Sequence, residues 1–154
     1  MTDGLERALA GHHRFETDVT GYVPTNIIFD ARVSVEDGAL RVENQVPTLD
    51  AVVAGETVAP VVEDGWFETF ERRVEDVGGV TKADDVAVIG VDRSDETITV
   101  ESELQATPGT AGGDALAVVN YVEGTWVEGI IPGYDYVDSV EAVRARARQT
   151  AQER

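Results

Sequence analysis

The sequence predicts an α+β fold: an antiparallel sheet of four to five strands, built from two hairpins, with helices packed mainly on one face. Three observations support this class. Residues 26–46 alternate apolar and polar side chains around a turn, and residues 87–100 repeat that alternation around a second turn. Between them, residues 64–77 carry large apolar side chains at helical spacing. Because 154 residues is the size of one ordinary domain, we expect residues 1–154 to share a single core.

The charge of the chain is strongly acidic, and the acids are spread along its whole length. Thirty Asp and Glu residues oppose twelve Lys and Arg residues, for a net charge of −18, and Lys82 is the only lysine. Molar salt screens most of the repulsion between such charges. We therefore expect a halophilic cytoplasmic protein, with an acidic mesophilic protein as the alternative. The acidity also argues against nucleic acid as a partner, because phosphate contacts need a basic surface.

Several kinds of site find no support in the sequence. The absence of cysteine excludes disulfides and thiolate metal sites. No apolar run approaches the ~20 residues that cross a membrane, and the first residues do not resemble a signal peptide. His12 and His13 are the only histidines, and adjacent residues diverge too widely on a helix to chelate together. We expect no metal, no cofactor, no catalytic residues and no membrane association.

A helix and one edge strand are expected before the first hairpin. The helix buries Leu5 and Leu9 and ends at Gly11. Residues 15–22 follow as a short edge strand, which glycine and proline interrupt.

The first hairpin has one register that satisfies its turn, its apolar face and its charges together. Residues 37–38, Asp-Gly, suit a two-residue type I′ turn, because both tolerate positive φ angles. This turn predicts the following opposite pairs: Val35 with Leu40, Val33 with Val42, Arg32 with Glu43, and Phe29 with Val46.

A helix and a second hairpin are expected next. Residues 48–62 are ambiguous, and a helix then begins at Asp64, buries Trp66 and Phe70 as the main core helix, and ends at residues 78–79. In the second hairpin, Gly90 indicates a bulge or a close neighbour. A four-residue loop at 93–96 predicts the following pairs, all facing the core: Val91 with Ile98, and Ile89 with Val100.

Residues 107–114, TPGTAGGD, separate the last strand from a helix. Glycine-rich loops in this position can hold phosphate, but the motif is incomplete and Asp114 would repel an anion. A connector is the favoured interpretation. Residues 115–122 then predict a short buried helix that stops at Gly124.

The segment 124–136 concentrates aromatic side chains among glycine and proline. One interpretation is a binding loop; the favoured one is a loop folded back over the core, whose aromatics fill gaps. If a site exists, its residues are the following: Trp126, Tyr134 and Tyr136 as walls, and Asp135 and Glu128 as polar groups.

A C-terminal helix is expected over residues 139–154, capped from Asp138, with fraying in its last turns. Its arginines favour either pairing with nearby acids or docking of a partner. They are Arg144, Arg146, Arg148 and Arg154.

Residues 124–136, GTWVEGIIPGYDY, resemble a small family of uncharacterised haloarchaeal proteins. The resemblance covers most of the chain; it implies a haloarchaeal cytoplasm and assigns no activity. The order of helices and strands is also similar to the fold of type III secretion chaperones, which bind peptides as dimers, and this analogy concerns the fold alone.

We therefore expect a non-enzymatic binding or adaptor domain that uses the loop 124–136 to hold a protein or peptide partner, and a homodimer is also considered. The alternative is a small-ligand-binding protein or small enzyme that uses the same loop. A concave site with a carboxylate of raised pKa would favour the enzyme, and a flat aromatic patch would favour a partner.

Overall fold

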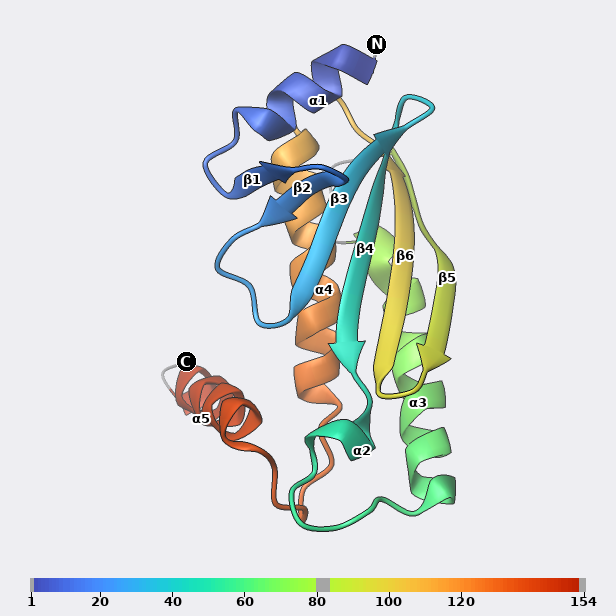
Figure 1. Cartoon of the computed structure of the whole chain (residues 1–154), viewed down its shortest axis with the longest axis vertical. Helices are drawn as coiled ribbons and strands as arrows, with labels where there is room; N and C mark the ends of the chain where they lie inside the picture. The colour runs from blue at the N-terminus through green and yellow to red at the C-terminus, as the bar shows by residue number, and fades with distance from the viewer. Residues whose placement is uncertain (1, 80–83, 153–154) are drawn as a thin grey trace.

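In the computed structural model, residues 2–79 and 84–152 are described, and they form one antiparallel sheet of six strands in the order β1-β2-β3-β4-β6-β5, with five α-helices and one 3₁₀ helix, η1 (Figure 1). The α+β class is confirmed, with slightly more strands than expected. The bounds are α1 Thr2–Ala10, β1 Phe15–Asp18, β2 Gly21–Pro24, β3 Asp30–Glu36, β4 Ala39–Pro47, α2 Leu49–Val52, α3 Pro60–Val74, η1 Glu75–Gly79, β5 Asp84–Ser94, β6 Thr97–Gln105, α4 Ala111–Glu128 and α5 Asp138–Gln152.

The hairpin of β3 and β4 has the predicted register. Val33 lies opposite Val42 and Arg32 lies opposite Glu43, and the turn residues Asp37 and Gly38 have φ angles of 51° and 78°. The ladder ends at the pair of Asp30 and Gln45, so the predicted pair of Phe29 and Val46 is not formed. The reason is that the amide of Phe29 donates to the Glu123 carboxylate of α4 rather than to β4.

The single edge strand expected at 15–22 is wrong, because this region forms the hairpin of β1 and β2. β2 meets β3 at one pair, Tyr22 with Val33. Gly21 makes this crossing possible, since a Cβ there would lie 2.6 Å from the Val33 carbonyl oxygen.

The hairpin of β5 and β6 has a tighter turn than predicted. Ser94 pairs with Thr97, so the turn holds two residues instead of four, and Val91 lies opposite Val100. A register shift between Val88 and Gly90 confirms the predicted bulge. The extra residue interrupts the alternation of side chains, so Ile89 is 48% exposed and its predicted core position is wrong.

The bounds of α3 and α4 differ from the prediction. α3 ends at Val74 and η1 continues to Gly79, whereas the helix was expected to end at residues 78–79. α3 begins at Pro60 rather than Asp64, with proline in its first turn. α4 is 18 residues long and includes the second half of the expected connector and the four residues after Gly124. Burial of its face against the sheet outweighs the cost of about 1 kcal/mol for an internal glycine. As a result α4, rather than α3, is the helix that runs along the middle of the sheet, behind β3 and β4 (Figure 1). The expected C-terminal helix is present as α5, the fraying of its last turns stays a prediction, and residues 153–154 lie outside the described residues.

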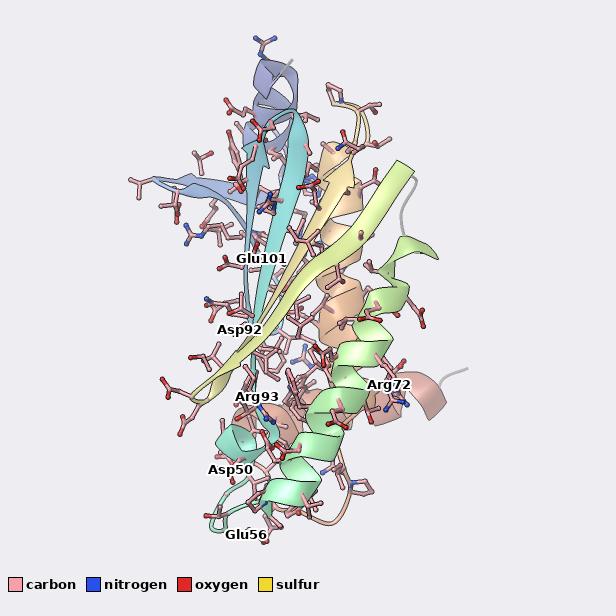
Figure 2. The ribbon with its side chains drawn as sticks, turned by 90° about the vertical axis from the view of Figure 1, so that its right-hand side faces the viewer. Asp50, Glu56, Arg72, Asp92, Arg93 and Glu101 are labelled. Atoms are coloured by element: carbon pink, nitrogen blue, oxygen red, sulfur yellow. The ribbon has the colours of Figure 1, made fainter. Side chains whose placement is uncertain are left out.

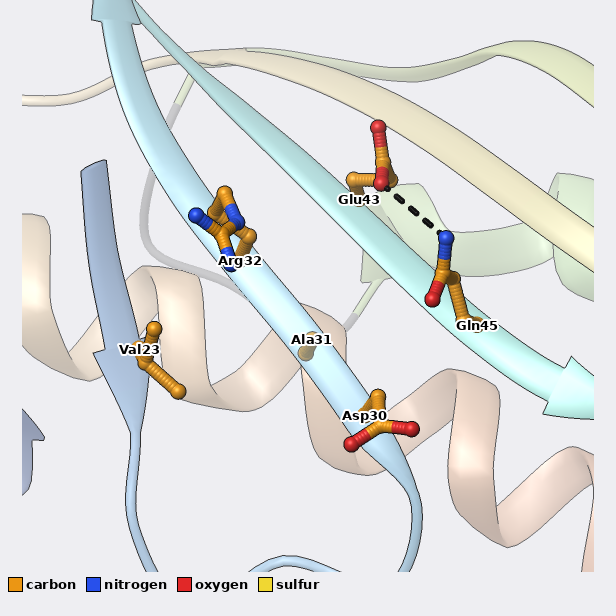
Figure 3. A pocket seen from close by; sticks show the side chains of 6 residues that line it. All are labelled: Val23, Asp30, Ala31, Arg32, Glu43 and Gln45. Carbon is orange, nitrogen blue, oxygen red and sulfur yellow. Dashed lines mark hydrogen bonds between the residues drawn. The ribbon is translucent and has the colours of Figure 1, made fainter. Parts of the chain in front are cut away.

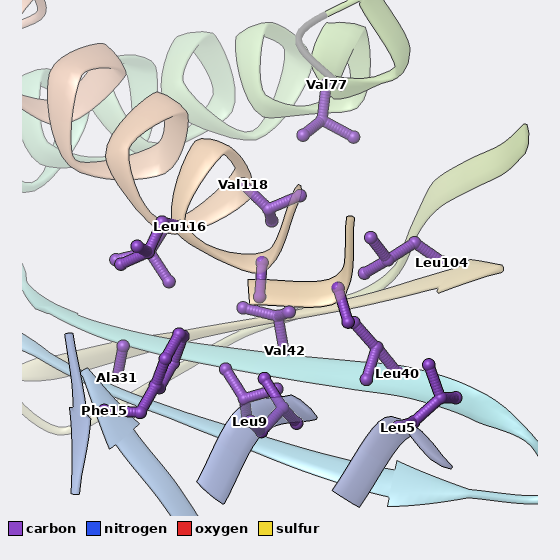
Figure 4. Close-up of a cluster of buried hydrophobic side chains, with 14 residues drawn as sticks. Leu5, Leu9, Phe15, Ala31, Leu40, Val42, Val77, Leu104, Leu116 and Val118 are labelled. Carbon is purple, nitrogen blue, oxygen red and sulfur yellow. The ribbon is translucent and has the colours of Figure 1, made fainter. Parts of the chain in front are cut away.

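The core consists of two clusters on the same face of the sheet, and α4 contributes to both. The first lies near α1 and includes Leu9, Phe15, Leu40, Val42, Leu104 and Val118 (Figure 4). The second lies towards α2, α3 and the start of α5 and includes Val46, Leu49, Trp66, Phe70, Ile98, Val122, Trp126, Tyr136 and Val140. Val33, Val42 and Ile98 are fully buried, so both hairpins turn their apolar sides to the same layer of helices.

Candidate functional site

The predicted wall residue Trp126 is a core residue on α4 and does not lie on a loop. Its side chain is 0% exposed, and its indole N–H donates to the Pro47 carbonyl oxygen at 2.8 Å. Its ring meets Phe29 edge-on at 4.8 Å between centroids and Trp66 at 6.4 Å. The helix therefore removes Trp126 from any surface that the segment 124–136 presents.

The rest of this segment, after α4, folds back against α2. The amide of Ala54 donates to the Asp135 carbonyl oxygen at 2.8 Å, and the amide of Val137 donates to the Val52 carbonyl oxygen at 2.9 Å. Tyr136 is 5% exposed, and its hydroxyl donates to the Ile131 carbonyl oxygen. This geometry matches the interpretation in which the loop covers the core.

The five predicted residues do not form one site. Tyr134 is half-buried and lies edge-on to Tyr136, with 6.4 Å between ring centroids. The side chain of Asp135 is exposed. Glu128 lines a groove of about 340 Å³ between α3 and the end of α4, together with Trp66 and Arg73. A binding role for these residues stays a prediction.

A different groove, here called the end groove, lies where five segments meet. It has a volume of about 380 Å³. Its walls come from the start of β3, the end of β4, α2, the turn before β6 and the first turn of α5. Its apolar lining consists of Phe29, Val46, Pro47, Ala51, Val52 and Val140. Its polar lining consists of Asp30, Gln45, Glu96, Thr97 and Ser139.

Local hydrogen bonds fix the walls of the end groove. Thr48 caps α2, because its hydroxyl accepts the amide of Ala51 at 3.3 Å. The amide of Thr48 donates to the Glu96 carbonyl oxygen at 3.0 Å and so ties the end of β4 to the turn before β6. The sequence predicted Phe29 and Val46 on one apolar face, but no local pattern predicts that α2 and α5 meet them there.

Glu123 holds one wall of the end groove in place, a role that was not predicted from the sequence. Its carboxylate is buried on α4 and accepts the amide of Ile28 at 3.0 Å and the amide of Phe29 at 2.7 Å. Burial raises the pKa of Glu123, the two backbone hydrogen bonds lower it, and the nearby charge of Asp30 raises it. A single acid in the apolar run of residues 115–127 was the available signal.

A second carboxylate of raised pKa, Glu63 on α3, also has a structural role. Burial raises its pKa, and its carboxylate accepts the amide of Asp50 at 3.1 Å. Asp50 in turn accepts the amide of Val58 at 2.7 Å. Glu63 therefore holds α2 against α3, and neither Glu63 nor Glu123 lines the grooves described here.

The opposite face of the sheet is polar. A depression of about 200 Å³ on this face is lined by Val23, Asp30, Ala31, Arg32, Glu43 and Gln45, whose side chains are drawn in Figure 3. Although Arg32 lies opposite Glu43, its guanidinium pairs with Asp18 of β1 at 2.9 Å. A hydrogen bond from the Thr20 amide and one from Arg32 lower the pKa of Asp18. Glu101 and Asp92 lie on this same face, away from α3 and α4 (Figure 2).

His12 and the glycine-rich segment, which are far apart in the sequence, meet in space. Both line a pocket of about 500 Å³ between α1 and the start of α4. Gly112 packs directly against the His12 ring, where a Cβ would collide with it. The Nδ1 of His12 accepts the Arg14 amide at 3.1 Å, and burial, followed by the charges of His13 and Arg14, lowers its pKa. Among residues 2–79 and 84–152, no cluster of three potential metal ligands occurs.

Comparison with known proteins identifies the family. Within the described part of the chain, no helix is long and apolar enough to cross a membrane. Neither the curated proteins nor the solved structures contain a significant match to the chain. The family profile described as "Family of unknown function (DUF5813)" matches residues 10–146, which is most of the sequence, and the chain therefore belongs to the DUF5813 family.

Proposed function

We propose that this chain is a non-enzymatic binding domain that holds a short protein segment in the end groove. The observation that carries the proposal is the groove itself: about 380 Å³, with an apolar lining and polar groups along it. This volume lies within the range of about 300–1,000 Å³ that is typical of ligand sites. The proposal keeps the predicted class of function and moves the binding surface away from the loop 124–136.

The chemistry of the lining indicates the kind of segment. Its charged side chains are the carboxylates of Asp30 and Glu96, and its remaining polar groups are neutral. Phe29, Pro47 and Ala51 are only half-buried, so they offer apolar contacts. A peptide with one large apolar side chain beside an arginine or lysine complements both features.

The walls of the end groove are pre-organised, which favours binding. Phe29 is held by its ring contact with Trp126 and by the bond from its amide to Glu123. Fixed walls lower the ordering cost that a ligand must overcome. The carboxylates of raised pKa, Glu63 and Glu123, accept backbone hydrogen bonds within the fold and so favour binding over acid–base chemistry.

We further propose a salt-rich haloarchaeal cytoplasm as the setting. The net charge of −18, spread along the chain, and the use of eleven arginines with one lysine support this setting. High salt screens the acidic surface and leaves apolar burial as the main contribution to peptide affinity.

A displayed library of random peptides, selected in molar potassium chloride, tests the function. We expect peptides that pair a large apolar residue with a basic one. Thr97→Trp fills the end groove and should abolish their binding, whereas Thr17→Trp, an exposed strand position far from the groove, should leave it intact. Selection of no peptides, or peptides that bind Thr97→Trp as well as the unaltered chain, would overturn the proposal.

A further inference from the structure

We propose that two copies of this chain pair through the exposed face of α5, with the two helices antiparallel about a two-fold axis at Ala142. This inference goes beyond the binding of a peptide in the end groove and does not depend on it. It follows from where α5 is attached, which of its faces is exposed and how charges are spaced on that face.

α5 is attached to the body of the protein through its first turns. Val140 is 1% exposed within the second core cluster. The guanidinium of Arg144 lies 5.1 Å from the centre of the Tyr136 ring and donates to Glu141 at 2.9 Å. Residues 145–147 are all exposed, and Figure 1 shows α5 standing apart from the sheet. The helix at residues 145–147 therefore has little of the chain packed against it.

The outward face of α5 carries an acid, a small residue and a base at equal intervals. Asp138, Ala142 and Arg146 are spaced four residues apart, and all three are exposed. Positions four apart on a helix differ by only about 40° in direction and about 6 Å along the axis, so these residues share one stripe. Ala145, also exposed, lies beside Ala142 on it.

This spacing is complementary to itself when two helices are antiparallel. Because Ala142 is midway between Asp138 and Arg146, a two-fold axis there places Asp138 of each copy opposite Arg146 of the other. Among the described residues Arg146 has no ion pair within its own chain, whereas Arg144 is held by Glu141. The small side chains at positions 142 and 145 allow the two helices to approach closely. A parallel pair would instead oppose Asp138 to Asp138.

The complementarity identifies a second copy as the partner, rather than an unrelated protein. A contact of two short helical faces buries less area than a standard interface, so the dimer is expected to be weak and concentration-dependent. Its ion pairs lie at the rim and contribute orientation more than affinity.

Sedimentation equilibrium of the full chain over a concentration series in molar potassium chloride tests the proposal. We expect a monomer–dimer equilibrium. Arg146→Asp should raise the dimer dissociation constant about threefold, because it turns two weak, partly screened attractions into two weak repulsions. Adding Asp138→Arg to Arg146→Asp should restore most of the lost affinity. Arg72→Asp, the same change of charge at an exposed position of α3, should leave the equilibrium unchanged.

Ala142→Glu decides the outcome if Asp138→Arg disturbs the start of α5. It places two carboxylates at the two-fold axis, and it should leave a monomer whose helix content by circular dichroism matches that of the unaltered chain. The proposal fails if the unaltered chain is monomeric at every concentration, if Ala142→Glu still dimerises, or if the charge-swapped chain, fully helical, binds no better than Arg146→Asp.

Discussion

At the scale of single residues, the carboxylate of Glu123 determines where the wall of the end groove lies. It accepts two backbone amides, those of Ile28 and Phe29, and thereby ends the β3–β4 ladder before Phe29. Phe29 then packs on Trp126 and lines the groove. One buried acid thus links α4 to the proposed binding surface.

Glu123→Ala should lower the free energy of unfolding by about 2–4 kcal/mol, since it leaves two amides without their acceptor. Glu128→Ala, at the exposed end of the same helix, should change it by less than about 0.5 kcal/mol. Denaturant titrations in molar potassium chloride measure both values. Equal stability of the two variants would show that Glu123 does not hold the 28–29 segment.

The stability difference between the unaltered chain and Glu123→Ala should depend on pH. The folded-state pKa of Glu123 is raised above its ordinary value of 4.5, so the folded chain binds this proton more tightly than the unfolded chain. The advantage of the unaltered chain is therefore largest below 4.5 and declines as the pH rises through the folded-state pKa. Denaturant titrations of both proteins at a series of pH values measure the difference. A stability difference that grows with pH would show that folding lowers the pKa of Glu123 instead of raising it.

Single residues were predicted well where a local pattern determined their surroundings. The inward direction of Val33 and Val42 followed from alternation around the turn at 37–38, and both are fully buried. The position of Trp126 was not predictable in this way, because glycine at 124 indicated a stop that burial against the sheet overrides. The end groove was also missed, because its residues come from five segments that only the tertiary fold brings together.

At the scale of elements, the two hairpins show what a turn sequence can specify. Asp37-Gly38 determined the register of β3 and β4 completely as far as the ladder extends. In the second hairpin the turn is Asp95-Glu96, and Asp95 has a φ angle of 55°. No glycine follows Asp95, so the sequence indicates this turn less clearly than Asp37-Gly38 indicates the first. The bulge beside Gly90 then changed which residues face the core.

The continuity of α4 through Gly124 can be tested by substitution. Gly124→Ala should raise the free energy of unfolding by about 0.5–1 kcal/mol, because alanine favours a helix interior and no atom beyond the neighbouring residues and the local helix backbone lies within 4 Å of the added Cβ. Gly38→Ala should destabilise the protein, since its φ angle of 78° disfavours a side chain. Thermal unfolding in molar salt measures both. A loss of stability in Gly124→Ala would contradict a continuous helix.

At the scale of the whole molecule, the acidic surface should make folding depend on salt. Electrostatic screening extends over about 30 Å at 0.01 M salt and about 3 Å at 1 M, so the repulsion that accompanies a net charge of −18 acts fully only in dilute buffer. We expect the chain to unfold in dilute buffer and to refold when potassium chloride is added. Sucrose, which does not screen charge, serves as the control in the same circular dichroism titration. A chain equally stable with and without salt would contradict the proposed setting.

The most direct test of the binding function is a map of amide resonances by nuclear magnetic resonance while a selected peptide is added. We expect the largest shifts around the end groove, at Phe29, Gln45, Thr97 and Ser139. Shifts confined to the segment 129–136, or no shifts at all, would contradict it.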